Sequence, residues 1–162
     1  ARGTGSLPDD LGFVVRLRDW AAIPAGVGIA IAAGLILSPI SNLVDENQDV
    51  VDELNNATGA KLVVFALIAG LAAPVFEELL FRGLLLRSLL AKFSPLVAIA
   101  ISATAFGTVH LLDFSLGTVV VLPALIAFGA ISAHQAVKTG DLSRSILLHV
   151  GFNLPAVIGA LF

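Results

Sequence analysis

Cysteine and methionine are both missing from this 162-residue sequence. Without cysteine, the chain can form no disulfide bond, thiolate metal site or cysteine nucleophile. Without methionine, we expect the sequence to be a fragment, a processed product or a trimmed form of a longer chain. The formal net charge of −3 lacks the basic excess typical of nucleic-acid binding, so no nucleic-acid partner is expected.

Charged residues are also scarce. They make up 13% of the sequence, whereas 57% is hydrophobic and the mean hydropathy is +0.99. Soluble domains carry about 25% charged residues, and a soluble fold of this size could not bury so much apolar surface. Lipid is therefore expected to be the solvent for much of the chain, and the length suits one compact helical domain.

Five apolar segments predict an all-α, polytopic transmembrane helical bundle. A span of about 30 Å of hydrocarbon needs about 20 apolar residues. Residues 1–20 are expected to be a polar leader, and residues 21–60 a first span followed by an acidic loop. We predict spans over residues 21–40, 61–90, 95–112, 116–137 and 143–162, with a kink at Pro74 in the second.

The basic residues favour one orientation. With five alternating spans, every lysine and arginine except Lys61 falls in loops on one side, which the positive-inside rule assigns to the cytoplasm. The sequence therefore predicts a cytoplasmic N-terminus and an external C-terminus. Its Ala-, Val- and Leu-rich composition favours a bacterial plasma membrane.

Polar side chains inside these spans are the candidate site. A charged residue at a helix centre costs about 2.5–3.5 kcal/mol on insertion scales, so retained ones usually function. Glu78 and Arg82 are four residues apart and can pair on one face. Glu77 points elsewhere, which suits a general base. Alternatively, the two acids and Arg82 form an ion cluster at the end of a helix.

Two later spans carry histidines. His110 follows Phe106 by one helical turn, and His149 shares a helix face with Asn153. Each pattern alone also fits a structural role, because histidine and asparagine join membrane helices through hydrogen bonds. His134 belongs to no such pattern and is expected to be interfacial.

In combination these motifs are more specific. Glu-Glu-x-x-x-Arg, Phe-x-x-x-His and His-x-x-x-Asn follow one another on successive spans. This order resembles the CAAX prenyl protease type II and bacteriocin-processing family, also called CPBP or Abi, over residues 61–162. The matching residues are Glu77, Glu78, Phe81, Arg82, Phe106, His110, His149 and Asn153.

The resemblance implies an intramembrane endopeptidase with its active site inside the bundle. Glu77 would activate a water, and His110 would bind or polarise it. His149 and Asn153 would stabilise the oxyanion, while Glu78 and Arg82, with Phe106, would support them. The substrate would be a membrane protein or peptide in the lipid bilayer.

A metal is a further hypothesis. Glu77, His110 and His149 could form a three-ligand zinc site with an open position, and a metal-free mechanism would use the same atoms. The usual His-Glu-x-x-His signature is absent. We expect a metalloprotease-type site, with Zn²⁺ as the hypothetical cofactor.

Convergence of the three side chains makes a demand on the fold. Glu77 and His149 are expected toward the inner ends of their spans, whereas His110 is expected near an outer end. The site therefore needs a tilted third helix, a start of that helix nearer the membrane surface, or a cavity that cuts into the bundle. Two other functions remain open, namely a bacteriocin-immunity or toxin-binding protein and a proton-coupled transporter, although no inverted repeat favours transport.

Overall fold

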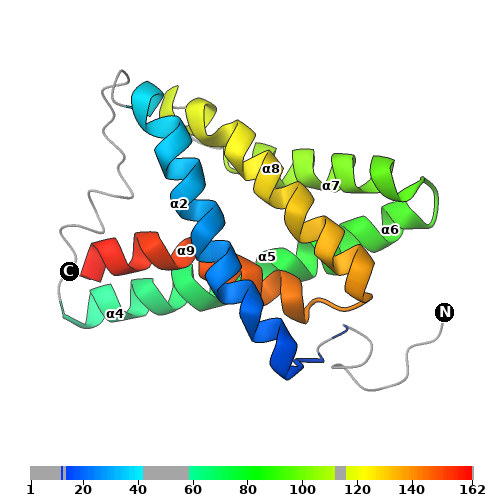
Figure 1. Cartoon of the computed structure of the whole chain (residues 1–162), viewed down its shortest axis with the longest axis horizontal. Coiled ribbons are helices and arrows are strands. Elements are labelled where there is room, and N and C mark those ends of the chain that lie inside the picture. Colours follow the sequence, from blue (N-terminus) through cyan, green and yellow to red (C-terminus); the bar gives the residue numbers. More distant parts are fainter. Residues whose placement is uncertain (1–11, 13, 42–58, 112–115, 162) are drawn as a thin grey trace.

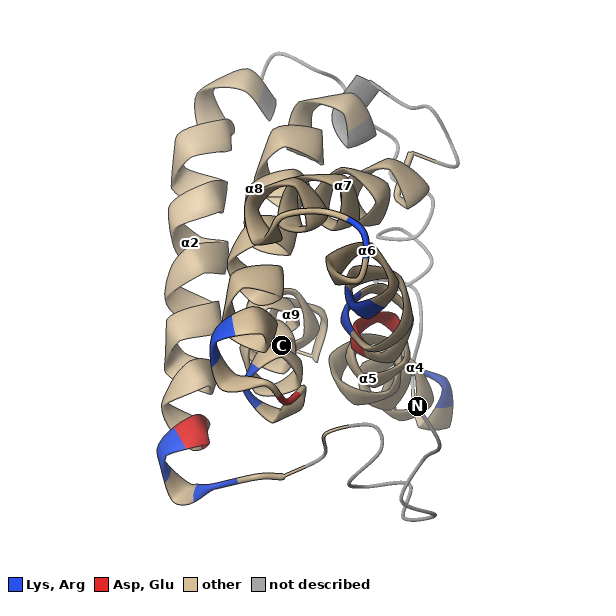
Figure 2. Cartoon of the chain, turned by 90° about the vertical axis from the view of Figure 1, so that its right-hand side faces the viewer, with Lys and Arg blue, Asp and Glu red and all other residues tan. Residues whose placement is uncertain are grey.

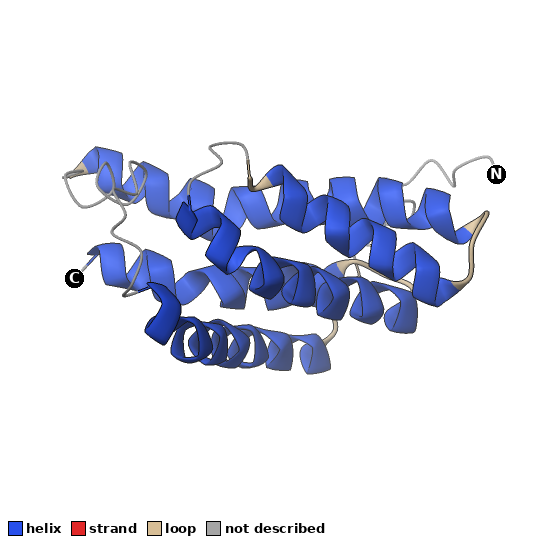
Figure 3. Cartoon of the chain, turned by 90° about the horizontal axis from the view of Figure 1, so that it is seen from above, coloured by secondary structure: helices blue, strands red, loops and turns tan. Residues whose placement is uncertain are grey.

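The computed structural model describes residues 12, 14–41, 59–111 and 116–161, and these form helices and turns with no strand among them (Figure 3). The predicted all-α class is confirmed. Most of the predicted leader and the acidic loop at 42–58 lie outside the described residues. In chain order the elements are η1 (Leu17–Ala21), α2 (Ala22–Ser41), α4 (Ala60–Leu67), η2 (Ile68–Ala72), α5 (Ala73–Glu78), η3 (Leu79–Leu86), α6 (Arg87–Leu90), α7 (Pro95–Val109), α8 (Leu116–Thr139) and α9 (Ser143–Leu161).

Four of the five predicted spans are long and apolar enough to cross a membrane: Leu17–Ile40, Ala60–Leu90, Val119–Thr139 and Ser143–Leu161. The first includes the 3-10 turn η1 before α2, and α2 itself begins at Ala22, one residue after the predicted start. The fifth apolar helix, α7, has 15 residues. At 1.5 Å per residue it is about 22 Å long, shorter than the hydrocarbon core.

The second span is one continuous helix of 31 residues. It contains two π-helical stretches, η2 before Pro74 and η3 after Glu78. In η2 the backbone N–H of Ala73 bonds to the carbonyl of Ile68, five residues back. In the same five-residue register, the carbonyl of Ala69 would bond to the backbone nitrogen of residue 74. Residue 74 is proline, which has no N–H to donate. The π-helical stretch is how the helix accommodates the proline where we predicted a kink.

The ends of the helices gather at two ends of the bundle. In Figure 1 α2 starts at the bottom, α9 starts to the right of centre and the α6–α7 turn lies at the far right, whereas the last turns of α2 and α9 lie toward the left. Figure 2 shows basic residues at the base of α2, at the start of α9 and on α6. Arg82, which we had placed among the loop charges, is instead fully buried in η3.

The crossing of α2 and α9 is unusually close (Figure 1). A Cβ added to Gly26 would meet the carbonyl oxygen of Leu148, and one added to Gly151 would meet the carbonyl oxygen of Ile23. Only glycine allows two backbones to approach in this way. The contact fixes the part of α9 that carries His149.

Candidate active site

Glu77 and His110 lie at similar depth because α6 and α7 form an antiparallel hairpin. Glu77 lies roughly 20 Å before the end of α6, and His110, at the end of α7, lies roughly 22 Å after Pro95. The depth mismatch expected from the sequence is therefore wrong. It arose because Glu77 was assigned to the inner end of its span, whereas it lies near the middle of a helix that runs from Ala60 to Leu90.

The carboxylate of Glu77 faces both histidines of the motif. Its Oε2 lies 3.8 Å from Nε2 of His110 and 3.7 Å from Nε2 of His149. This oxygen is buried and has no hydrogen-bond partner. The Glu77 and His110 side chains are 30% and 33% exposed, whereas that of His149 is 4% exposed. The cluster is thus closed on the His149 side and partly open on the other.

Each histidine is oriented through its other ring nitrogen. Nδ1 of His110 lies 2.8 Å from the carbonyl oxygen of Phe106, which can only accept, so Nδ1 carries a proton. Nδ1 of His149 lies 3.0 Å from Oε1 of Glu78, and an ionised carboxylate also only accepts. In their neutral forms both rings therefore present a lone pair at Nε2 toward Glu77, an arrangement that can bind either a water, which donates hydrogen bonds, or a cation.

Glu78 is a fully buried carboxylate that forms the support of the site. Nη1 of Arg82 lies 3.2 Å from its Oε1, and neither side chain is exposed. Its Oε2 accepts a hydrogen bond from Oγ of Ser132 at 2.8 Å. Arg82 also donates through Nη2 to the Gly129 carbonyl at 3.0 Å. A buried ion pair needs such extra bonds to offset desolvation, and here they link the second helix to α8 and α9.

Phe106 packs at the centre of the cluster. Its ring centroid lies 4.9 Å from that of His110 and 5.6 Å from that of His149. The guanidinium of Arg82 lies 4.5 Å from the same ring centroid, a cation–π distance. Phe128 adds a second contact to the His149 ring at 4.9 Å. These rings hold both imidazoles in place and limit water access to the buried side.

Asn153 is placed differently from the two histidines. Its Nδ2 donates to the carbonyl of Ala69 at 2.9 Å, the carbonyl that Pro74 leaves without a backbone donor. This bond uses one of the two amide hydrogens of Asn153. It ties α9 to the second helix about one turn beyond His149.

Ser132 is a residue of the site that the sequence did not reveal. It lies in α8, to which we had assigned no site residue, and is fully buried. Its carbonyl accepts a hydrogen bond from Oγ of Ser145 at 3.0 Å, so it joins Glu78 to α9 as well. The available signal was a serine on an apolar helix three residues after Gly129. His134, on the same helix, is exposed.

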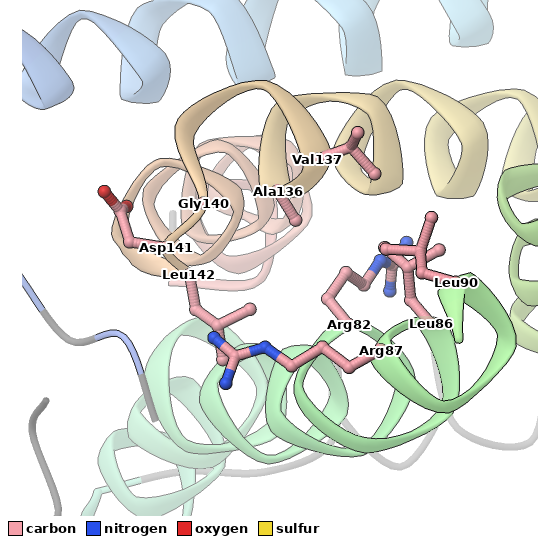
Figure 4. Close-up of a pocket in the computed structure, with 9 residues that line it drawn as sticks. All are labelled: Arg82, Leu86, Arg87, Leu90, Ala136, Val137, Gly140, Asp141 and Leu142. Carbon is pink, nitrogen blue, oxygen red and sulfur yellow. The ribbon is translucent and has the colours of Figure 1, made fainter. Parts of the chain in front are cut away.

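A cavity of about 150 Å³ lies beside Arg82, between the second helix and the end of α8 (Figure 4). Figure 4 shows Arg82 and Arg87 on one side and Ala136 and Val137 on the other. Nε and Nη1 of Arg82 are buried without a hydrogen-bond partner.

The donor set of Glu77, His110 and His149 suits a catalytic zinc ion chemically. Among the described residues, however, no three His, Cys, Asp or Glu side chains are arranged closely enough to form a ready-made metal site. Zinc bonds of about 2.0–2.1 Å place tetrahedral ligand atoms roughly 3.3 Å apart, so the 3.7 and 3.8 Å separations would have to contract slightly. Metal-binding histidines usually make a hydrogen bond through the ring nitrogen that does not bind the metal. Both histidines here make such a bond through Nδ1.

The match to a known family decides the identification. The family model described as type II CAAX prenyl endopeptidase Rce1-like matches residues 59–155, which include the whole cluster. The chain belongs to the Rce1-like CAAX endopeptidase family. The resemblance inferred from the motifs is thereby confirmed. Together with its apolar helices, Rce1-like membership makes this an integral membrane protein of the CAAX protease class. No curated protein and no solved structure matches the chain.

Proposed function

We propose that this chain hydrolyses a peptide bond of a membrane-associated protein or peptide, using a water activated by Glu77. The observation that carries the proposal is the position of Glu77 Oε2, which is buried, unpartnered and within 3.8 Å of both histidine Nε2 atoms. A water in this gap would give one hydrogen to Glu77 and one to His110. A general base must be within such reach of the proton it removes.

The reaction then needs only groups of the cluster. Glu77 removes a proton as the water oxygen bonds to the scissile carbonyl carbon, and the carbonyl electron pair moves to oxygen. When the carbon–nitrogen bond breaks, Glu77 returns the proton to the amine, leaving a carboxylic acid product. His149 lies between the carboxylates of Glu78 and Glu77, and in its doubly protonated form its Nε2–H can donate to the oxyanion.

Asn153 and the supporting residues complete the proposed roles. The second amide hydrogen of Asn153 is assigned to the oxyanion, one helical turn from His149. Glu78, Arg82 and Phe106 hold the histidines in position. If Zn²⁺ binds, Glu77, His110 and His149 would hold it, and it would polarise the water and carbonyl as a Lewis acid.

We place the entry of the substrate on the side of the cluster where Glu77 and His110 are each about one-third exposed. The family description names prenyl endopeptidases, so prenylated C-terminal peptides are one substrate class to test.

Basic residues at one end of the bundle support a cytoplasmic N-terminus and an external C-terminus. We assign the chain to a bacterial plasma membrane on its composition.

The test is cleavage of a library of prenylated and unprenylated membrane peptides by purified protein in detergent. Wild type, His110→Ala, His149→Ala and the control His134→Ala are compared, each with and without a chelator. Wild type and His134→Ala should cleave, and the other two should not. Cleavage that is lost in chelator and restored by Zn²⁺ would support a metal-dependent reaction. Cleavage that is unchanged in chelator would support the metal-free reaction. No cleavage by wild type would favour a bacteriocin-immunity or toxin-binding role instead.

A further inference from the structure

A second cavity, of about 270 Å³, lies away from the cluster, between the first turns of α2, the end of α8 and the start of α9. Its polar lining consists of Arg18 from η1, which directly precedes α2, Gln135 from α8 and Arg144 from α9. The rest of its lining is apolar and consists of alanines of the first span together with Leu148. In Figure 1 the three elements meet at the lower end of α2.

The charges around this cavity do not cancel. Asp141 binds Arg16 at 2.7 Å and Asp19 binds Arg144 at 3.0 Å, so each acid already has an arginine. Arg18 makes no ion pair or hydrogen bond within the part of the chain that the structure describes. The cavity is therefore lined by one arginine with no acidic partner and a second one that is held in place by Asp19.

Arg144 also keeps an unused side. Its Nε and Nη2 both donate to Oδ1 of Asp19, at 3.3 and 3.0 Å. A guanidinium has five N–H groups in a planar fork, so the edge formed by Nη1 and the second hydrogen of Nη2 remains. This edge can bind two oxygens of a phosphate at once. Gln135, from α8, supplies a further amide donor.

Apolar residues next to the cavity place it at the surface of a membrane. Trp20 is 55% exposed and Leu17 is 90% exposed, and both lie in the same 3-10 turn as Arg18. Tryptophan is enriched at the level of lipid headgroups, and a leucine so exposed needs lipid to cover it. The mouth of the cavity then lies where phospholipid phosphates are.

We propose that this cavity binds the phosphate of an anionic membrane phospholipid. Arg18 and Arg144 would contact the phosphate and Gln135 would donate to it, while the alanines and Leu148 would contact the glycerol and the first acyl carbons. Basic pockets between transmembrane helices commonly bind anionic headgroups. Free phosphate shares the same chemistry but would leave the apolar half of the cavity without a ligand.

Bound lipid would hold together the helices that position His149. Leu148, which lines the cavity, directly precedes His149 in α9, and the other two walls belong to the first span and α8. A ligand that binds only the folded state raises its stability. Anionic lipid is therefore expected to raise the unfolding temperature without entering the reaction.

The experiment is native mass spectrometry and thermal unfolding of the delipidated 162-residue chain in neutral detergent. Phosphatidylglycerol, phosphatidylcholine and inorganic phosphate are added separately to wild type, Arg18→Gln, Gln135→Leu and Lys138→Gln. Lys138 lies at the same end of α8 but does not line the cavity, so its variant removes equal charge elsewhere. Unfolding temperatures without lipid show that each variant folds.

We expect wild type and Lys138→Gln to retain phosphatidylglycerol in preference to phosphatidylcholine and to be stabilised by it. Arg18→Gln should bind it about five-fold more weakly, and Gln135→Leu should also bind it more weakly with the charge unchanged. Equal retention by wild type and Arg18→Gln would overturn the site. Equal binding of the two lipids would overturn the preference for anionic lipid. Displacement of phosphatidylglycerol by inorganic phosphate, with equal stabilisation, would make free phosphate the ligand.

Discussion

Oε2 of Glu77 lies 3.7 Å from Nε2 of His149, and no hydrogen bond joins the two atoms. The ring of His149 is fixed on its other side by Glu78. The two adjacent glutamates therefore contact one imidazole from opposite sides, although they point in different directions from their helix. This arrangement separates a carboxylate free to react from one that supports the site.

Ser132 should matter because it donates to the supporting carboxylate. Ser132→Ala leaves Oε2 of buried Glu78 without this donor, which we expect to cost about 1–3 kcal/mol of unfolding free energy and to lower kcat. Ser102→Ala is the matched control, since Ser102 is equally buried but donates to the Phe81 carbonyl. Equal kcat values in the two variants would show that Ser132 does not position the site.

The close crossing of α2 and α9 should tolerate no side chain at Gly151. In Gly151→Ala the new methyl group would meet the backbone of Ile23, so the helices must separate, at a cost of about 1–3 kcal/mol. Gly159→Ala lies on the same helix with open space around it and should be neutral or slightly stabilising. Unfolding in detergent measures both, and equal stability of the two variants would contradict the close contact.

Asn153 combines a structural bond with a proposed role at the oxyanion. Asn153→Ala should slow cleavage by about 10²–10³-fold if the amide is an oxyanion donor. Pro74→Ala restores a backbone N–H for the Ala69 carbonyl and so makes the structural bond dispensable. In that background the same Asn153→Ala defect should persist, as measured by kcat/KM in a double-mutant cycle. A defect that disappears there would mean that Asn153 acts only through the helix.

The sequence predicted the motif residues and part of their geometry. The four-residue spacing of Glu78 and Arg82 predicted their ion pair, and the order of the motifs predicted which side chains would meet. The link between Asn153 and Ala69 could not be predicted, because it depends on a π-helical register that a proline suggests but does not determine. Ser132 was missed for a similar reason, since its role depends on which face of α8 meets Glu78.

The contacts of the residues before the first span could not be predicted for a different reason. Arg16, Arg18 and Asp19 lie in the predicted polar leader, since charges usually lie outside a span. In the structure Asp19 is buried against Arg144, and Arg16 binds Asp141. These pairs join residues 125 positions apart in the chain, and local sequence patterns hold no information on such distant partners.

The most direct test of the central claim is the cleavage rate of a peptide substrate by Glu77→Gln beside wild type. Glutamine keeps the size of the side chain but cannot accept the proton of the water, so we expect turnover to fall to the level of a blank. The unfolding temperature should stay close to that of wild type. Full activity in Glu77→Gln would contradict the assignment of Glu77 as the general base.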